Sequence, residues 1–76
     1  MTGLYGPLSP EAWIEGVFSS KSAMRGQVIR RARRDVDRYA GLERLLSEVG
    51  RRGYRAIENG GQVIIFCNNE PVRVLV

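Results

Sequence analysis

The chain has 76 residues, of which 43% are hydrophobic and 26% are charged, a composition typical of one small globular domain. It has no histidine and a single cysteine, which excludes disulfide frameworks, zinc ribbons, serine–histidine triads and cysteine–histidine dyads within one chain. Because these residue types are missing, we expect a protein that is not an enzyme and needs no cofactor or metal. No apolar run reaches the ~20 residues of a membrane span and no signal-peptide pattern opens the sequence, so we expect it to be cytoplasmic.

The positive charge is concentrated in the middle of the sequence. Twelve basic residues, eleven of them arginine, face eight acidic ones, a net charge of +4. Between Lys21 and Arg55 there are eleven basic and four acidic residues, net +7. Because arginine is suited to phosphate and carboxylate groups, this segment indicates a binding surface. The alternative is a composition bias of the coding sequence with no functional demand.

Residues 1–8 lack periodicity and predict an extended arm. Ser9, Pro10 and Glu11 then form a helix start, with a capping hydroxyl, a proline at the first helical position and an acid near the positive end of the helix dipole. Apolar residues at Ile14, Val17 and Phe18 predict a short helix of about ten residues.

A second helix is predicted from Ser22 or Ala23 to Ala40, with Gly26 as a weak point. Helical spacing gathers its apolar residues on one side and its arginines on the other, with Arg33 at the margin. The apolar set is Val28, Ile29, Ala32, Val36 and Tyr39, and the opposite set, an arginine ridge, is Arg30, Arg31, Arg34 and Arg38.

A third short helix is predicted from the spacing of Leu42, Leu45, Leu46 and Val49. It ends where Gly50 and Gly53 bracket Arg51 and Arg52, which place positive charge at the negative end of the helix.

The remaining segments predict strands. Residues 54–58 and 62–67 are separated by Asn59-Gly60-Gly61, the residue types of a tight hairpin turn. A second turn at 68–71 leads to a last strand at 72–76. We therefore predict one α+β domain over 1–76, with two to three N-terminal helices followed by a three-stranded antiparallel meander: arm 1–8, helical part 9–53, β-meander 54–76.

The predicted central strand is apolar on both faces. Val63, Ile65 and Cys67 lie on one face, and Ile64 and Phe66 on the other. A strand of a sheet with one solvent-exposed face normally alternates polar and apolar residues, so we expect another element to pack on the second face of this sheet. We expect the first helix, with Trp13 and Phe18, to be that element, and a partner chain is the alternative. The apolar strand at 72–76 is an unprotected edge, which makes a homodimer possible.

Two resemblances concern the second half of the chain. The first is to short alphaproteobacterial proteins, some of which carry the name phosphoribosylanthranilate isomerase. The chain resembles them at Arg51-Arg52-Gly53-Tyr54, Glu58 to Gln62, Phe66-Cys67-Asn68 and Glu70-Pro71. That activity belongs to an eight-stranded barrel of ~200 residues or more, far longer than this chain. The resemblance therefore implies no activity.

The second resemblance is to HicA-type mRNA interferase toxins, which have a fold like that of the double-stranded-RNA-binding domain. Leu42–Val49 stand for the family's helix, Gly53-Tyr54 for its strand opening, and Gly61-Gln62 for the position of its Ser-His pair. Since the catalytic histidine is missing here, the resemblance implies a nucleic-acid-binding scaffold without nuclease activity.

We therefore expect a non-enzymatic binding or regulatory protein whose arginines engage nucleic acid, a nucleoprotein complex or an acidic protein surface. The alternative is a phage- or mobile-element-encoded stoichiometric inhibitor of the anti-CRISPR type, which docks on a host defence effector complex. Cys67 has no histidine to activate it and is expected to be structural. The candidate binding residues are Arg30, Arg31, Arg34, Arg38, Arg51, Arg52 and Arg55.

Overall fold

Helix α1 (Pro10–Phe18) begins where the sequence predicts. The Oγ of Ser9 accepts a hydrogen bond from the Ala12 N–H at 3.1 Å, and Pro10 occupies the first turn. Ile14, Val17 and Phe18 are buried along one side of the helix. The computed structural model describes residues 9–76, so the arm expected over 1–8 lies outside the described residues.

The single helix predicted from Ser22 or Ala23 to Ala40 is wrong. In its place the chain forms α2 (Lys21–Met24), β1 (Val28–Ala32) and α3 (Arg33–Tyr39). The physical reason is Gly26, which has φ +75°. The Gly26 N–H bonds the Ala23 carbonyl at 3.1 Å and the Gln27 N–H bonds the Ser22 carbonyl at 2.8 Å, the two bonds of a Schellman helix stop.

The third predicted helix is confirmed as α4 (Leu42–Arg51). Leu45 and Val49 are buried, and the helix ends in a second Schellman motif, in which Gly53 has φ +77°. There the Tyr54 N–H bonds the Val49 carbonyl and the Gly53 N–H bonds the Gly50 carbonyl, both at 3.0 Å.

The predicted hairpin is also confirmed, as β2 (Arg55–Asn59) and β3 (Gln62–Phe66). Gly60 and Gly61 have φ +57° and +77°, so both central residues of the two-residue turn occupy the conformation that glycine adopts without strain. The three-stranded antiparallel sheet has the order β1-β3-β2, with β3 in the centre.

The meander is wrong in one strand. Residues 72–76 form no strand, and β1 takes the place beside β3 that we expected them to fill. The difference follows from burial, because β1 contributes Ile29, only 5% exposed, to the core, whereas Val74 and Leu75 are 86% and 82% exposed. The fold class remains α+β with a three-stranded antiparallel sheet.

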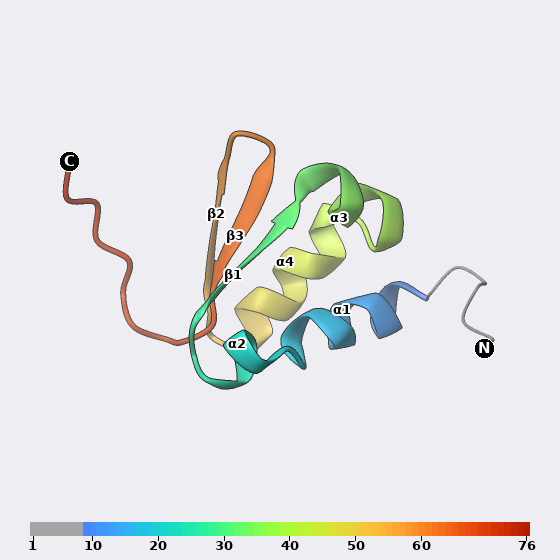
Figure 1. Ribbon diagram of the computed structural model, residues 1–76, viewed down its shortest axis with the longest axis horizontal. Coiled ribbons are helices and arrows are strands. Elements are labelled where there is room, and N and C mark those ends of the chain that lie inside the picture. The colour runs from blue at the N-terminus through green and yellow to red at the C-terminus, as the bar shows by residue number, and fades with distance from the viewer. Residues whose placement is uncertain (1–8) are drawn as a thin grey trace.

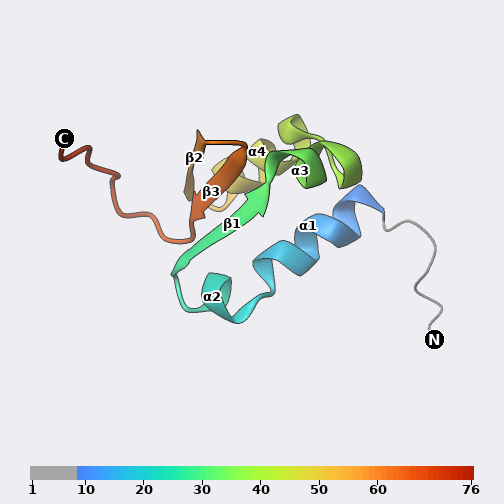
Figure 2. The ribbon, with the colours of Figure 1, turned by 45° about the horizontal axis from the view of Figure 1, so that its top comes forward.

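The helices lie on one side of the sheet, as both views show (Figure 1, Figure 2). From the sheet, Ile29, Val63, Ile65 and Cys67 enter the core. They join buried helix side chains from all four helices: Ile14, Val17, Phe18, Ala23, Val36, Leu45 and Val49. The cover expected for the second face from α1 is therefore wrong, since Phe18 packs on the first face with the rest of the core.

Aromatic contacts hold α1 in place. The Trp13 ring stacks on the Tyr39 ring of α3 with centroids 5.8 Å apart and an interplanar angle of 17°. The Phe18 ring lies 6.0 Å from that of Tyr54, the residue that precedes β2. These two contacts tie both ends of α1 to the rest of the fold.

Candidate nucleic-acid interface

The second face of the sheet is open to solvent. Side chains alternate along each strand, and the register places them in rows across the three strands. One row is Val28, Phe66 and Arg55, and the next is Arg30, Ile64 and Ile57. The third row is Ala32, Gln62 and Asn59. We call these nine residues the open face.

The centre of the open face is apolar and partly exposed. Ile64 and Phe66, on the central strand, are half-buried, and their neighbours Val28 and Ile57 are each 46% exposed. The helices do not reach these side chains, whereas their neighbours Val63 and Ile65 in the same strand are 2% and 0% exposed. The surface thus presents an aromatic ring within an apolar stripe that no described residue covers.

Two arginines flank this apolar centre. Arg55 lies directly across from Phe66 on β2, and Arg30 lies across from Ile64 on β1. Both are exposed, and neither forms an ion pair with a carboxylate among residues 9–76. The nine residues of the open face include no acid, so its formal charge is +2.

The arginine ridge expected on one helix does not form. Arg30 and Arg31 are in β1 and therefore point to opposite faces of the sheet, while Arg34 and Arg38 are exposed on α3. Arg31 donates from Nη1 to the carbonyl of Arg30 at 2.7 Å, and the guanidinium of Arg38 lies 5.6 Å from the Tyr39 ring centroid. The four residues therefore lie on two elements, and the two on β1 point to opposite faces of the sheet.

Arg51 and Arg52 are held by an acid instead. Both donate to the carboxylate of Glu48, with 2.6 Å between Arg52 Nε and Glu48 Oε2. These hydrogen bonds, first from Arg51 and then from Arg52, lower the pKa of Glu48 to about 2. The two arginines are therefore already neutralised in part and are weaker candidates for an anionic ligand than Arg30 and Arg55.

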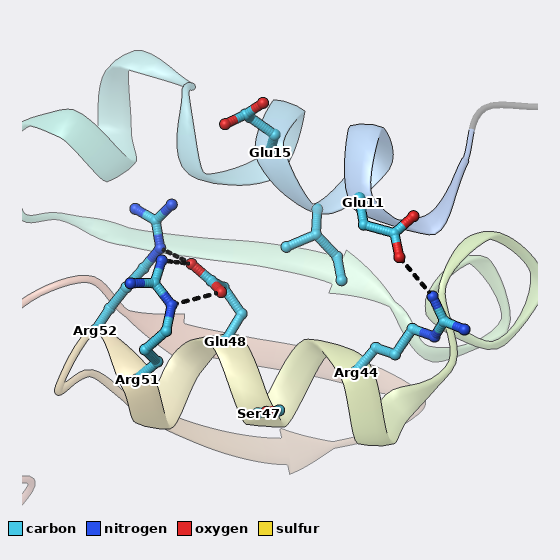
Figure 3. Close-up of a pocket in the computed structure, with 8 residues that line it drawn as sticks. Glu11, Glu15, Arg44, Ser47, Glu48, Arg51 and Arg52 are labelled. Carbon is cyan, nitrogen blue, oxygen red and sulfur yellow. Dashed lines mark hydrogen bonds and ion pairs between the residues drawn. The ribbon is translucent and has the colours of Figure 1, made fainter.

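The cluster around Glu48 lines a groove of about 470 Å³ between α1 and α4 (Figure 3). At the other end of the groove, Arg44 Nη1 donates to Glu11 Oε2 at 2.8 Å. Its charged residues balance, three of each sign: Arg44, Arg51 and Arg52 against Glu11, Glu15 and Glu48. A charge-balanced groove has no net attraction for an anion, so the open face is the better candidate interface.

The sequence reasoning did not assign Phe66, Ile64, Ile57 and Val28 to a binding site. The sequence does carry a signal for them, since the predicted central strand is apolar on both faces, but the prediction that α1 covers the second face is wrong. What was missing was β1, whose identification as a strand brings Val28 and Arg30 beside Phe66 and Ile64.

No exposed thiol and no cluster of metal-ligating side chains accompanies this surface within residues 9–76. Cys67 is 3% exposed, and burial raises the pKa of its thiol above the ordinary value. No group of three or more histidine, cysteine, aspartate or glutamate side chains gathers in the part of the chain that the structure describes. None of the helices in that part has the length and hydropathy to cross a membrane.

Comparison with known proteins finds no family model, no curated protein and no solved structure that matches the chain.

Proposed function

We propose that this protein binds single-stranded nucleic acid on the open face of its sheet. The observation that carries the proposal is the environment of Phe66. This aromatic side chain is on the central strand, has Arg55 as its cross-strand neighbour and Arg30 one row away on the opposite strand, and has no acid on its face.

The chemistry of the open face matches the two parts of a nucleotide. A partly exposed aromatic ring on an apolar surface can stack on a base that is free of pairing, and arginines beside it neutralise the phosphates. Neighbouring strands are ~4.8 Å apart and neighbouring rows ~7 Å apart, so Arg30 and Arg55, on the two edge strands and one row apart, lie roughly 12 Å apart on either side of β3. A single strand that crosses the sheet would meet Phe66 between the two charges.

The same charges disfavour self-association through this face. Two copies packed face to face would bring four arginines together with no carboxylate of the open faces to offset them. An anionic ligand relieves this repulsion, whereas an apolar partner would bury unpaired guanidinium groups, which is costly. The unpaired arginines thus support an anionic partner over a second open face.

The experiment is a fluorescence-anisotropy titration at several salt concentrations. The labelled probes are a single-stranded RNA, a single-stranded DNA of the same sequence and the corresponding duplex. We expect the single strands to bind more tightly than the duplex, with affinity that falls as salt rises. Absence of binding to every probe at low salt would overturn the proposal.

A variant pair locates the site. Replacing both Arg30 and Arg55 with glutamine removes two phosphate contacts and should reduce the salt slope by about 1.4, since each contact on a single strand contributes about 0.7. The matched control replaces Arg34 and Arg38, two arginines on α3 that are also exposed and form no ion pair among the described residues. If the control variant loses binding and the first variant keeps it, the open face is not the site.

A third variant tests the stacking contact. Phe66→Leu keeps an apolar side chain at the centre of the face but removes the aromatic ring. We expect affinity for single strands to fall by an amount within the range of about 1–3 kcal/mol known for base–aromatic contacts. Unchanged affinity would contradict the proposed function. So would a protein that binds no probe but binds an acidic protein, such as a host defence complex, in a way that survives nuclease treatment.

A further inference from the structure

The outer edge of β2 carries an apolar hollow. It has a volume of about 110 Å³ and is lined by Leu42 and Leu46 of α4 and by Ala56 and Ile57 of β2, with Glu58 and Val63 beside them. Leu46 is 43% exposed there and Ile57 46% exposed. Because β2 has a neighbour on one side only, alternate backbone N–H and C=O groups along its other side have no partner strand.

The segment Val72–Val76 has a strand-like sequence but no sheet to pair with. Four of its five residues are apolar, and its alternation places Val72, Val74 and Val76 on one side and Arg73 and Leu75 on the other. Val74 and Leu75 are 86% and 82% exposed, and Figure 1 shows this end of the chain running away from the body of the protein. Such a segment gains hydrogen bonds and apolar burial by joining a sheet edge.

The same chain cannot easily supply this strand to its own β2. Asn68 is fixed at the exit of β3, where its Nδ2 donates to the Gly26 carbonyl at 3.0 Å and its Oδ1 accepts from the Glu70 N–H at 3.0 Å. From Asn68 to Val72 the chain spans at most about 14 Å, at 3.3–3.6 Å per residue, and the Asn68–Glu70 hydrogen bond shortens that reach. The outer side of β2 is two strand spacings, roughly 10 Å, from β3, and the chain must also pass around the start of β2, so little length is left for the reversal.

We propose that Val72–Val76 of one copy adds as a fourth strand to the β2 edge of a second copy, and that reciprocal exchange gives a twofold dimer. Val72, Val74 and Val76 face the hollow beside Leu42, Leu46 and Ala56. Leu75 then lies on the side of Ile57 and extends its apolar stripe. The opposite orientation would direct Arg73 into the hollow, where its charge has only apolar lining and the paired Glu58 nearby.

The first test is the solution mass of the full chain by light scattering across a concentration series. We expect a mass that rises from 8.5 kDa, the mass of the single chain, toward twice that value. Val74→Lys and Leu46→Lys, on the two sides of the proposed contact, should each raise the dimer dissociation constant by about tenfold or more, since each removes an apolar contact. Both positions are exposed in the single chain, so the fold should persist, which circular dichroism checks.

The matched control is Val28→Lys. The exposed fraction of Val28, 46%, is similar to the 43% of Leu46. Val28, however, is on β1, at the opposite edge of the sheet. It should leave the dimer intact. A constant mass of 8.5 kDa at high micromolar concentration, or dissociation by the Val28 variant alone, would overturn the proposal.

A cross-linking test separates exchange between copies from folding back within one. Leu46→Cys and Val74→Cys are made in separate chains and mixed under mild oxidation, with the unmodified chain as a control for Cys67. We expect the mixture to form more of a disulfide-linked species of two chains than either variant forms alone. In the variant that carries both substitutions, a link formed only within the single chain would show that the segment folds back on its own β2, which would contradict the exchange. Neither test contains nucleic acid, so their outcome is independent of the proposed function.

Discussion

The guanidinium of Arg52 lies over the ring of Phe18, with 4.5 Å between its central carbon and the ring centroid. The same side chain donates from Nε to Glu48 at 2.6 Å. Arg52 follows α4 and Phe18 ends α1, so this one residue couples the two helices through a cation–π contact and an ion pair.

We predict that Arg52→Lys destabilises the fold although it keeps the charge. Lysine lacks the planar group that stacks on Phe18 and donates to Glu48 with a fixed geometry. The expected loss is about 0.5–1 kcal/mol, the range of a cation–π contact at an exposed site, read from urea unfolding. Arg51→Lys is the control, because Arg51 contacts Glu48 without an aromatic partner; an equal loss there would show that stacking on Phe18 contributes nothing.

Glu48 predicts an acid-sensitive component of stability. Its pKa in the folded protein is about 2, below the ordinary value of 4.5, because Arg51 and Arg52 hydrogen-bond the charged carboxylate. A depressed pKa stabilises the fold above pH 4.5, and this contribution is lost as the pH falls from 4.5 to about 2. Urea midpoints between pH 7 and pH 2 should show a smaller acid-induced decrease in Glu48→Gln than in the wild type. Parallel curves for the two proteins would contradict this assignment.

The two glycines of the hairpin turn should respond differently to substitution. Gly60, at φ +57°, tolerates asparagine, which adopts the left-handed conformation more readily than other residues, so Gly60→Asn should change stability little. Gly61→Ala should cost about 1–2 kcal/mol, because a Cβ at φ +77° is strained even though no atom lies within 4 Å of it. Thermal unfolding followed by circular dichroism measures both. A stable Gly61→Ala variant would show that the turn can change its type.

Cys67 should react slowly with thiol reagents. Burial is the main cause that raises the pKa of its thiol, and the nearby Arg52 and Arg31 oppose the shift without cancelling it. Less thiolate is therefore present at pH 8 than for a free cysteine, and the sulfur is buried. We expect modification by an aromatic disulfide reagent to be slow in buffer and fast in denaturing urea. Equal rates in the two conditions would indicate that the sulfur is accessible in the folded chain.

Local signals predicted α1, α4 and the β2–β3 hairpin correctly. Each has a start or stop whose chemistry acts within a few residues: the Ser9 cap, the Gly53 stop and the Gly60-Gly61 turn. Gly26 makes the same Schellman stop as Gly53, yet the sequence pattern predicts only a weak point inside a helix there. The reason is that apolar residues at helical spacing continue past Gly26, so the periodicity predicts a helix where the glycine ends one.

The identity of the third strand depends on a pairing that no local pattern contains. Val28–Ala32 and Val72–Val76 both have strand-forming residues, and only one segment can pair with the free side of β3. Ile29 decides the outcome by filling the core beside Ile65. The candidate site changed for the same reason, since a strand places Arg30 on the open face and Arg31 on the other.

Val28 pairs with Phe66 across 38 positions of the chain, whereas Asn59 and Gln62 close the hairpin within three. The two strand pairings therefore differ in the entropy cost of loop closure. The hairpin closes only a short loop, whereas pairing of β1 with β3 closes a long loop that contains α3, α4 and β2. We expect β1 to join the sheet late in folding. A substitution such as Ile29→Val should then speed unfolding far more than it slows refolding, so that the lifetime of the folded protein depends on its first strand.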